Sequence, residues 1–386
     1  MPEMMDSGIE WIKEIPFDWD ISPLKYNYHL IAGATPDSSN MALWDGNVNW
    51  ITPADFKTKD IFVSEGARKL SEMGYKSCST SMVPAGSIIF SKRAPIGSVA
   101  ISTQELCTNQ GCLSLVAKNN AVNNKYYYYV LSIYDDVFNL YGSGTTFKEI
   151  SATVFGNVML PYPNRDLQNK IVAFLDSKCA EIDFLLSDIQ SEIEILEEYK
   201  KSVITEAVTK GLNPNVPMKD SSVQWIGMMP EHWECIKGKY VLKYLQKPVR
   251  EDDGVITCFR DGEVTLRSNR REDGFTMSDK EIGYQGIDVG DLVVHGMDGF
   301  AGSIGISDSR GKASPVLNVL DTDMDKKYVM YYLRSMAYSD VFLALTTGIR
   351  VRSCDLRWNK LAELLYPVPP LDEQIKISAH IDDTLE

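Results

Sequence analysis

Apolar residues repeat every seven positions between Asp166 and Lys210, and no other stretch of the chain keeps this period. A second, mostly apolar series follows the first by four positions, and several acidic residues lie between the two series. This pattern predicts a long amphipathic helix that carries the seam of a coiled coil. The two series are Leu175, Ile182, Ile189, Leu196 and Val203, and Cys179, Leu186, Ile193, Lys200 and Ala207.

The predicted helix has clear ends, because Pro161 and Pro163 precede it and Gly211 and Pro214 follow it. At about 1.5 Å per residue, it would be on the order of 65 Å long. A long surface helix on one globular body is the simpler alternative, but five heptads in register favour a helix that separates two bodies. We call its apolar face the seam and expect it to bind a partner. The seam comprises Leu175, Ile182, Leu186, Ile189, Ile193, Leu196 and Val203.

The sequence also repeats itself on a larger scale. A motif of the form DSxxxWIxxxPxxW begins at Asp6 and returns at Asp220, so that two tryptophans and a proline match in register. The segment from Pro161 to Ile171 returns as Pro367 to Ile377, including a matched aspartate, glutamine and lysine. The chain therefore contains two copies of one unit.

Matched segments inside the two copies predict matched elements. Glycine-led apolar runs at 86–90 and 97–101 correspond to runs at 290–294 and 302–306, which are typical of buried strands. Residues 125–131 correspond to 327–333 and have the pattern of amphipathic helices. Each copy should be a mixed α/β globule of about 150 residues followed by a long helix.

The predicted fold class is therefore α+β, with two similar globules in a tandem repeat joined by a long coiled-coil helix. The expected boundaries are 1–160 and 214–366 for the globules, 161–213 for the helical region and 367–386 for the start of a second one. Between the matched blocks the copies share little, since 44–75 has no counterpart in 260–284. A duplicated scaffold with divergent interiors suggests one kind of binding performed on two targets.

Charge changes this picture less than the total suggests. The net charge is −14, which argues against a nucleic-acid partner at first sight. The excess acid lies largely on the predicted helix, however, and acidic and basic residues roughly cancel within each globule. DNA therefore stays a possible partner.

Cysteine, histidine and hydropathy patterns exclude several classes. The seven cysteines form no CxxC pair and the four histidines have no paired spacing, so we expect no metal and reduced thiols. No apolar run is long enough for a membrane span, and the acidic start is unlike a signal peptide. These features predict a cytoplasmic protein.

Motifs of common enzymes are missing. The sequence has no GxxxxGK[ST] loop, no GxGxxG after a strand, no GxSxG elbow and no [DNS]PP[YFW] loop for methyl transfer to a base. We therefore predict that the chain is not an enzyme and needs no cofactor. A catalytic site of an unrecognised kind is kept as an alternative hypothesis.

Polar and basic residues gather on predicted turns and strand ends of both globules. Arginine and lysine can pair with guanine, asparagine and glutamine with adenine, and threonine with phosphate or a thymine methyl group. Each residue alone could be an ordinary surface side chain, but the set on two matched globules favours nucleic acid. The candidates are Lys92, Arg93, Asn109, Gln110, Thr145, Thr146 and Lys148 in the first copy, and Arg267, Arg270, Arg271, Arg350 and Arg352 in the second.

These motifs together resemble the specificity subunit of a type I restriction-modification system. The marks are the repeated opening motif, the FKEIS run at 147–151, the EAVTKG helix end at 206–211 and the PPLDEQ segment at 369–374. The resemblance implies two target-recognition domains that each read half of a split double-stranded DNA site. It also implies two long antiparallel helices that bind methyltransferase (modification) subunits, with restriction subunits joining through the complex.

One departure from the family pattern concerns the second helix. Family members usually extend it to match the first, whereas this sequence stops at Glu386, about 30 residues short of the counterpart of Lys210. We expect a truncated second helix and an incompletely paired seam, and therefore possible self-association. The alternative function is a truncated or repurposed coiled-coil scaffold that assembles protein partners without reading DNA.

Overall fold

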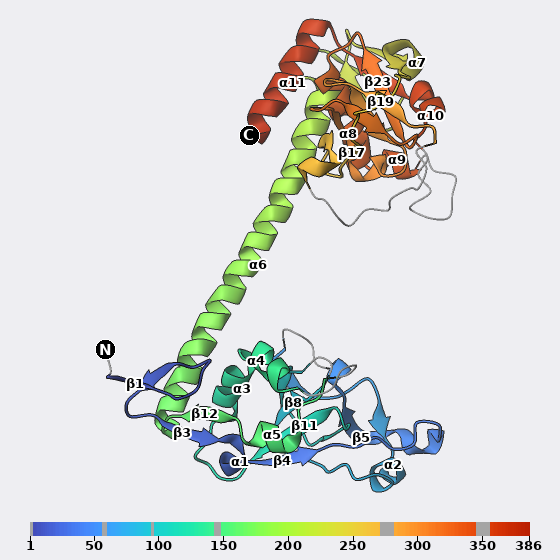
Figure 1. Ribbon diagram of the computed structural model, residues 1–386. Helices are drawn as coiled ribbons and strands as arrows, with labels where there is room; N and C mark the ends of the chain where they lie inside the picture. The colour runs from blue at the N-terminus through green and yellow to red at the C-terminus, as the bar shows by residue number, and fades with distance from the viewer. Residues whose placement is uncertain (1–2, 56–59, 94–95, 143–147, 271–281, 345–355) are drawn as a thin grey trace. The chain divides into compact units, whose positions relative to one another are not determined.

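The computed structural model describes residues 3–386 except 56–59, 94–95, 143–147, 271–281 and 345–355. Two compact units emerge, Met1–Leu186 and Ser187–Glu386, and Figure 1 shows the elements of each. The boundary between the units lies within one long helix.

The first unit is built on a five-stranded sheet with the order β4-β11-β8-β9-β6. Neighbouring strands are antiparallel except for β6, which runs parallel to β9. The middle strands are buried because they consist mainly of Ile, Val, Leu and Phe. The strands are β4 (Tyr28–Ala32), β6 (Phe62–Val63), β8 (Ile88–Ser91), β9 (Val99–Ser102) and β11 (Cys112–Ala117).

Helices α3 (Asn124–Ser132), α4 (Asp135–Tyr141) and α5 (Ala152–Gly156) contribute to the core of the first unit. Phe90 of β8 stacks on Phe155 with ring centroids 4.0 Å apart. Tyr126 and Tyr127 are buried, so the tyrosine run of α3 belongs in part to the core.

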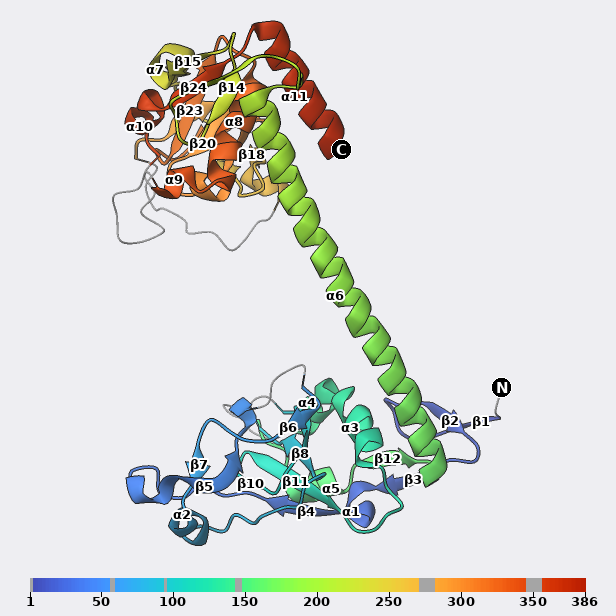
Figure 2. The same ribbon diagram turned by 180° about the vertical axis from the view of Figure 1, so that it is seen from behind.

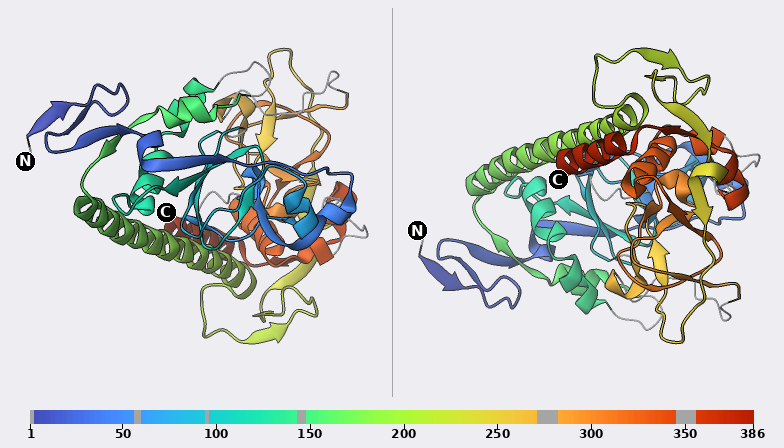
Figure 3. Two further views of the ribbon diagram at one scale, coloured as in Figure 1. Left: turned by 90° about the horizontal axis from the view of Figure 1, so that it is seen from below. Right: turned by 90° about the horizontal axis from the view of Figure 1, so that it is seen from above.

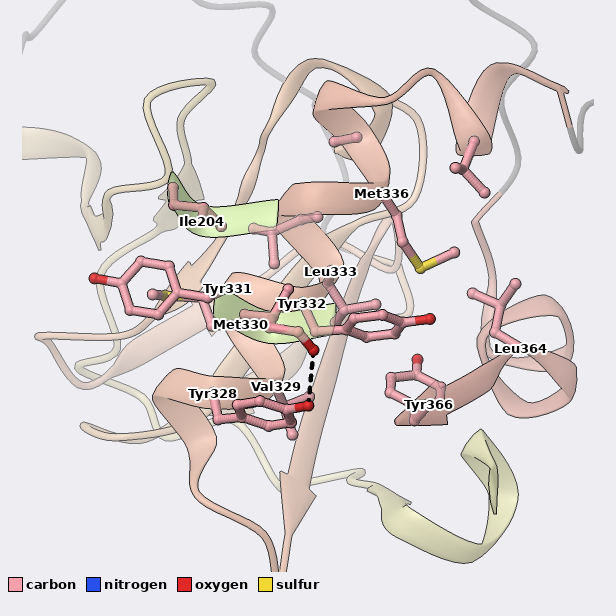
Figure 4. Packing of buried hydrophobic residues seen from close by; sticks show 14 of the residues in the cluster. Ile204, Tyr328, Val329, Met330, Tyr331, Tyr332, Leu333, Met336, Leu364 and Tyr366 are labelled. Carbon is pink, nitrogen blue, oxygen red and sulfur yellow. Dashed lines mark hydrogen bonds between the residues drawn. The ribbon is translucent and has the colours of Figure 1, made fainter. Parts of the chain in front are cut away.

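The second unit repeats this sheet, with the order β16-β23-β20-β21. Helix α8 (Lys326–Tyr338) packs on it, and Figure 4 shows Tyr328, Tyr332 and Tyr366 in the resulting core. The strand order matches β4-β11-β8-β9 of the first unit, so the predicted duplication is confirmed. The elements are β16 (Leu242–Tyr244), β20 (Leu292–His295), β21 (Ile304–Ile306), β23 (Leu317–Thr322), α9 (Val341–Ala344) and α10 (Trp358–Glu363).

Each unit is closed by a strand pair that joins its beginning to its end. β3 (Asp20–Pro23) pairs antiparallel with β12 (Met159–Tyr162), and β15 (Glu234–Lys237) pairs with β24 (Leu365–Val368). A short hairpin, which has the first tryptophan of the repeated motif in its turn, precedes each pair. The hairpins are β1 (Met4–Asp6) with β2 (Glu14–Pro16), and β13 (Met218–Asp220) with β14 (Met228–Pro230).

The two units differ in the structure added outside the shared sheet. The first carries β10, β5 and β7 in one small sheet, and the second carries the pairs β17-β18 and β19-β22. Of these strands, β5, β7 and β18 come from the unmatched stretches 44–75 and 260–284. The elements are β5 (Trp44–Ile51), β7 (Lys69–Leu70), β10 (Cys107–Thr108), α2 (Glu72–Lys76), β17 (Ile256–Cys258), β18 (Val264–Leu266), β19 (Gln285–Ile287) and β22 (Gly311–Ala313), with single turns at α1 (Leu24–Asn27), α7 (Gly238–Val241), η1 (Met41–Leu43), η2 (Pro53–Asp55), η3 (Arg267–Asn269) and η4 (Gly299–Ala301).

The long helix α6 runs from Arg165 to Lys210, which confirms the prediction from the heptads. It ends where Gly211 adopts a left-handed conformation with φ of +74°. Five members of the seam, Ile182, Leu186, Ile189, Ile193 and Leu196, are between 44% and 59% exposed, and Leu175 and Val203 are half-buried.

Within the second unit, α11 (Leu371–Leu385) lies beside the C-terminal end of α6, as all the ribbon views show (Figures 1, 2 and 3). Ile377 and Ile381 of α11 share one core with Ile204 and Val208 of α6. The Tyr328 hydroxyl donates to the Val208 carbonyl oxygen at 3.0 Å, which ties α8 to the same place.

Candidate nucleic-acid interface

Three polar segments of the first unit meet where β8 ends. The backbone N–H of Lys92 donates to the Gly111 carbonyl at 2.9 Å, and the N–H of Ile150 donates to the Lys92 carbonyl at 3.0 Å. Arg93 also forms an isolated antiparallel bridge with Glu149. The sheet therefore brings together the turn between β10 and β11, the end of β8 and the segment after α4.

Side chains at this junction have different surroundings. The Lys92 ammonium lies 2.6 Å from Glu149 Oε1 and is only 13% exposed, so its charge is already balanced. Gly111 separates Arg93 from Asn109, since a Cβ there would lie 3.0 Å from both Arg93 Nε and Asn109 Oδ1. Glycine at this position therefore allows the close approach without displacing the two side chains.

The remaining candidates of the first unit lie on the surface. Gln110 is exposed and hydrogen-bonded to Thr35, and Lys148 is exposed next to the Arg93–Glu149 bridge. The structure thus gathers Lys92, Arg93, Asn109, Gln110 and Lys148 at one junction. Thr145 and Thr146 lie outside the described residues.

The second unit has the same junction with different side chains. The N–H of Leu356 donates to the Gly296 carbonyl at 2.8 Å, as Ile150 does to Lys92 in the first unit. Gly296 therefore replaces Lys92, and the exposed Met297 follows it.

His295, just before this position, serves the backbone. Its Nδ1 accepts from the N–H groups of Met297 (3.2 Å) and Asp298 (2.9 Å). Burial lowers the pKa of His295, which outweighs the opposing effect of Asp298 and favours the neutral ring. His295 thus fixes the backbone of the turn that follows β20.

Arginines of the second unit lie close to this junction but are paired with acids. Arg260 Nη2 is 3.0 Å from Asp298 Oδ1, and its side chain is 65% exposed. Arg270 Nη1 is 2.7 Å from Asp261 Oδ2, and its guanidinium stacks over Phe259 at 4.3 Å from the ring centroid. Paired surface arginines can exchange a carboxylate for a phosphate or a base edge.

Arg267 lies in the same segment and donates from Nε to Thr257 Oγ1 at 3.4 Å. Arg271, Arg350 and Arg352 lie outside the described residues. Arg260 and Met297 were not among the sequence candidates, because Arg260 lies in the unmatched stretch 260–284 and Met297 is apolar. Gly296 occupies the position that matches Lys92. Aligning the two copies would therefore have pointed to Met297, which follows it.

Other chemistry finds no support within the described ranges. They contain no group of three or more His, Cys, Asp or Glu side chains placed to hold a metal ion. No helix among them is both long enough and apolar enough to cross a membrane.

A family profile described as the type I restriction modification DNA specificity domain matches residues 16–194. Residues 16–194, a little under half of the chain, are therefore similar to this specificity family. The type I restriction enzyme MjaIX specificity subunit of Methanocaldococcus jannaschii is 33% identical over 189 residues, which is 48% of this chain and 43% of that relative. The match thus spans less than half of the relative's length.

Two solved structures share the fold. A chain from a type I restriction-modification system, solved in work on complex assembly and conformational transition, has a TM-score of 0.67 and 15% identity over 96% of this chain and 91% of that chain. The HsdS subunit from Thermoanaerobacter tengcongensis has a TM-score of 0.54 and 14% identity over 96% and 89%. Identity this low shows a shared architecture alone.

Proposed function

We propose that this chain is the DNA sequence-specificity subunit of a type I restriction-modification complex and carries out no catalytic step itself. Each globule, 1–160 and 214–366, reads one half of a bipartite site in double-stranded DNA. One observation carries the proposal: the two units share a strand order but present different side chains after the matched strands β8 and β20.

The difference at this place favours reading of two unlike sequences. Lys92 and Arg93 follow β8, whereas Gly296 and Met297 follow β20. Arg93 and Gln110 offer donors suited to guanine and adenine edges, while Met297 offers an apolar contact that suits a thymine methyl group. Two copies of one scaffold with these differences fit two different half-sites.

The long helix serves assembly in this proposal. The exposed seam members of α6 form an apolar stripe that soluble proteins rarely leave open. Methyltransferase subunits bind along the seam, and restriction subunits join through the resulting complex. The chain needs no cofactor because the methyl transfer takes place in its partners.

Methylation profiling of host DNA tests the proposal. Cells with the methyltransferase subunit are compared with and without the gene for this chain, and a split motif of two half-sites should be methylated only in its presence. The purified complex should bind that motif with an affinity that falls steeply as salt rises.

Two other results would contradict the proposal in distinguishable ways. A stable complex that methylates or binds DNA without sequence preference would support the coiled-coil scaffold. Methyl transfer by the purified chain alone would support an enzyme with an unrecognised site.

A further inference from the structure

Each unit is fastened to the helix that follows it by the same polar contacts. In the first unit, Gln168 of α6 accepts at Oε1 from the Asn123 N–H (2.7 Å) and donates from Nε2 to the Pro163 carbonyl (2.7 Å). In the second, Gln374 of α11 accepts from the Asp325 N–H (2.9 Å) and donates to the Pro369 carbonyl (2.7 Å).

Both glutamines are buried. The residues that donate to them, Asn123 and Asp325, are the N-caps of α3 and α8. The start of each sheet-packed helix is therefore fixed to the first turns of α6 or α11.

A second contact lies eight residues further along each long helix. Asp176 Oδ2 of α6 is 2.8 Å from Lys125 Nζ, and its Oδ1 accepts from the Tyr129 hydroxyl at 2.6 Å. Asp382 of α11 receives the same two contacts from Lys327 and Tyr331, each at 2.5 Å.

The protonation states suit these contacts at neutral pH. Burial opposes ionisation of Asp176, but the hydrogen bonds from Lys125 and Tyr129 outweigh it and lower its pKa. Burial, and then the hydrogen bond to Asp176, raise the pKa of the Tyr129 hydroxyl, so that it stays a donor.

Hydrogen bonds are directional, whereas apolar packing is not. Two hydrogen-bonded contacts eight residues apart therefore fix the angle between each long helix and its globule. Eight helical residues span about 12 Å, so the glutamine and the aspartate hold each long helix at two separate points. The two units have diverged in their added strands and loops, yet both retain these side chains. What the copies share is therefore the geometry of attachment.

We propose that Asp176 with Tyr129, and Asp382 with Tyr331, are positioning residues that set the number of base pairs accepted between the two half-sites. The inference rests on the proposed function. One base pair advances DNA by about 3.4 Å and turns it by about 35°. A globule that rocks on its helix would reach neighbouring spacings as well as the preferred one.

The two attachments should contribute unequally. The second unit is also held by Ile204 and Val208 of α6 and by Ile377 and Ile381 of α11 in one core. In the first unit, Val172 is the buried apolar residue that α6 contributes to the core. Loss of the Asp176 contacts should therefore matter more than loss of the Asp382 contacts.

The test uses the full chain with its methyltransferase partner on DNA in which both half-sites are fixed and the spacer is varied by up to two base pairs. The variants are Asp176→Asn with Tyr129→Phe, and Asp382→Asn with Tyr331→Phe. Each pair keeps the side-chain shapes but loses the charged hydrogen bond. The matched control is Glu181→Gln, whose exposed ion pair with Lys178 lies within α6.

Wild-type protein and the control should prefer one spacer. The Asp176 pair should lower the ratio of methylation at that spacer to its neighbours by about tenfold, as expected for loss of one charge-assisted contact. The Asp382 pair should lower it less, and base preference within each half-site should not change.

Equal loss of methylation at all spacers, with an unchanged ratio, would mean that these residues only stabilise the fold and would overturn the inference. An unaltered ratio with full activity would do the same. If the wild-type chain directs no methylation at any spacer, the proposed function itself is contradicted, and this inference fails with it.

Discussion

At the scale of single residues, the second unit contains an ionic network that no sequence pattern indicates. Arg310 donates from Nε and Nη2 to the two carboxylate oxygens of Asp253, both at 3.0 Å, and also contacts Asp288. Lys247 bridges Asp288 (2.8 Å) and Asp291 (2.7 Å). Since Asp253 and Asp291 are buried, each needs its cation.

This network predicts acid sensitivity. Hydrogen bonds from Lys247 and Arg310 lower the pKa of Asp288 to about 2, whereas an unfolded aspartate titrates near 3.9. The stabilisation is complete above about pH 4 and is lost as the pH falls towards 2. Asp288→Asn should therefore lower the free energy of unfolding at pH 7, by about 1 kcal/mol after allowance for solvent screening.

Urea unfolding at pH 7 and at pH 2.5 measures this effect. The difference between wild type and Asp288→Asn should shrink at the lower pH. Asp323→Asn is the control, because Asp323 pairs with Lys243 at a site that is 86% exposed. A difference that stays constant with pH would show that the carboxylate of Asp288 contributes nothing through its charge.

The candidate site could be predicted only where the two copies match. Lys92, Arg93, Asn109 and Gln110 lie next to matched strands, and the structure brings them together. Their ion pairs and local hydrogen bonds could not be predicted, because Glu149 is distant from Lys92 in sequence. Arg260 was missed because it lies in the unmatched stretch 260–284 and its partner, Asp298, is distant in sequence.

At the scale of elements, α6 follows closely from the sequence. Five heptads with prolines before them and a glycine after them largely determine the bounds of this helix. The predicted start at Asp166 differs by one residue from the observed Arg165. Short strands such as β7 and β17 could not be predicted, since two or three residues carry no periodicity and their pairing is decided by distant segments.

The exposed seam leads to a prediction about association. Ile189→Asp with Leu196→Asp should abolish binding of the methyltransferase partner, because each apolar side chain contributes about 1.5 to 3 kcal/mol when buried. The thermal stability of the isolated chain should hardly change, since both residues are about half exposed in it.

Light scattering on the purified chain, alone and with the partner, measures the association. The wild-type chain alone should form dimers or larger species, and the double variant should weaken them. Ser191→Asp is the matched control, because residue 191 lies on the face of α6 opposite to the seam. Unchanged assembly in the double variant would place the interface elsewhere.

At the scale of the whole molecule, the internal repeat predicted most of the organisation. Two tryptophans and a proline in register defined equivalent ends, and the matched strands and helices followed. The strands β5, β7 and β18 could not be derived, because the stretches 44–75 and 260–284 that contain them have no match in the other copy. The segments that distinguish the two units are therefore the ones that comparison of the copies cannot predict.

Two matched units predict effects that are confined to one half-site. Arg350→Ala with Arg352→Ala should relax recognition in the half-site read by the second unit, at about 1 to 3 kcal/mol for each lost base contact. Lys148→Ala should affect the other half-site. Binding to DNA libraries randomised in one half at a time measures both, and equal weakening of both halves would indicate phosphate contacts.

The strand pairs that close each unit also determine when each unit can fold during translation. β3 must wait for β12, which emerges from the ribosome only after nearly all of the first unit has been synthesised. Such distant pairing slows folding, and domains generally fold as units from the N-terminus onwards. The first unit should therefore complete its fold while α6 is being translated, and the second should do so only once β24 is free to meet β15.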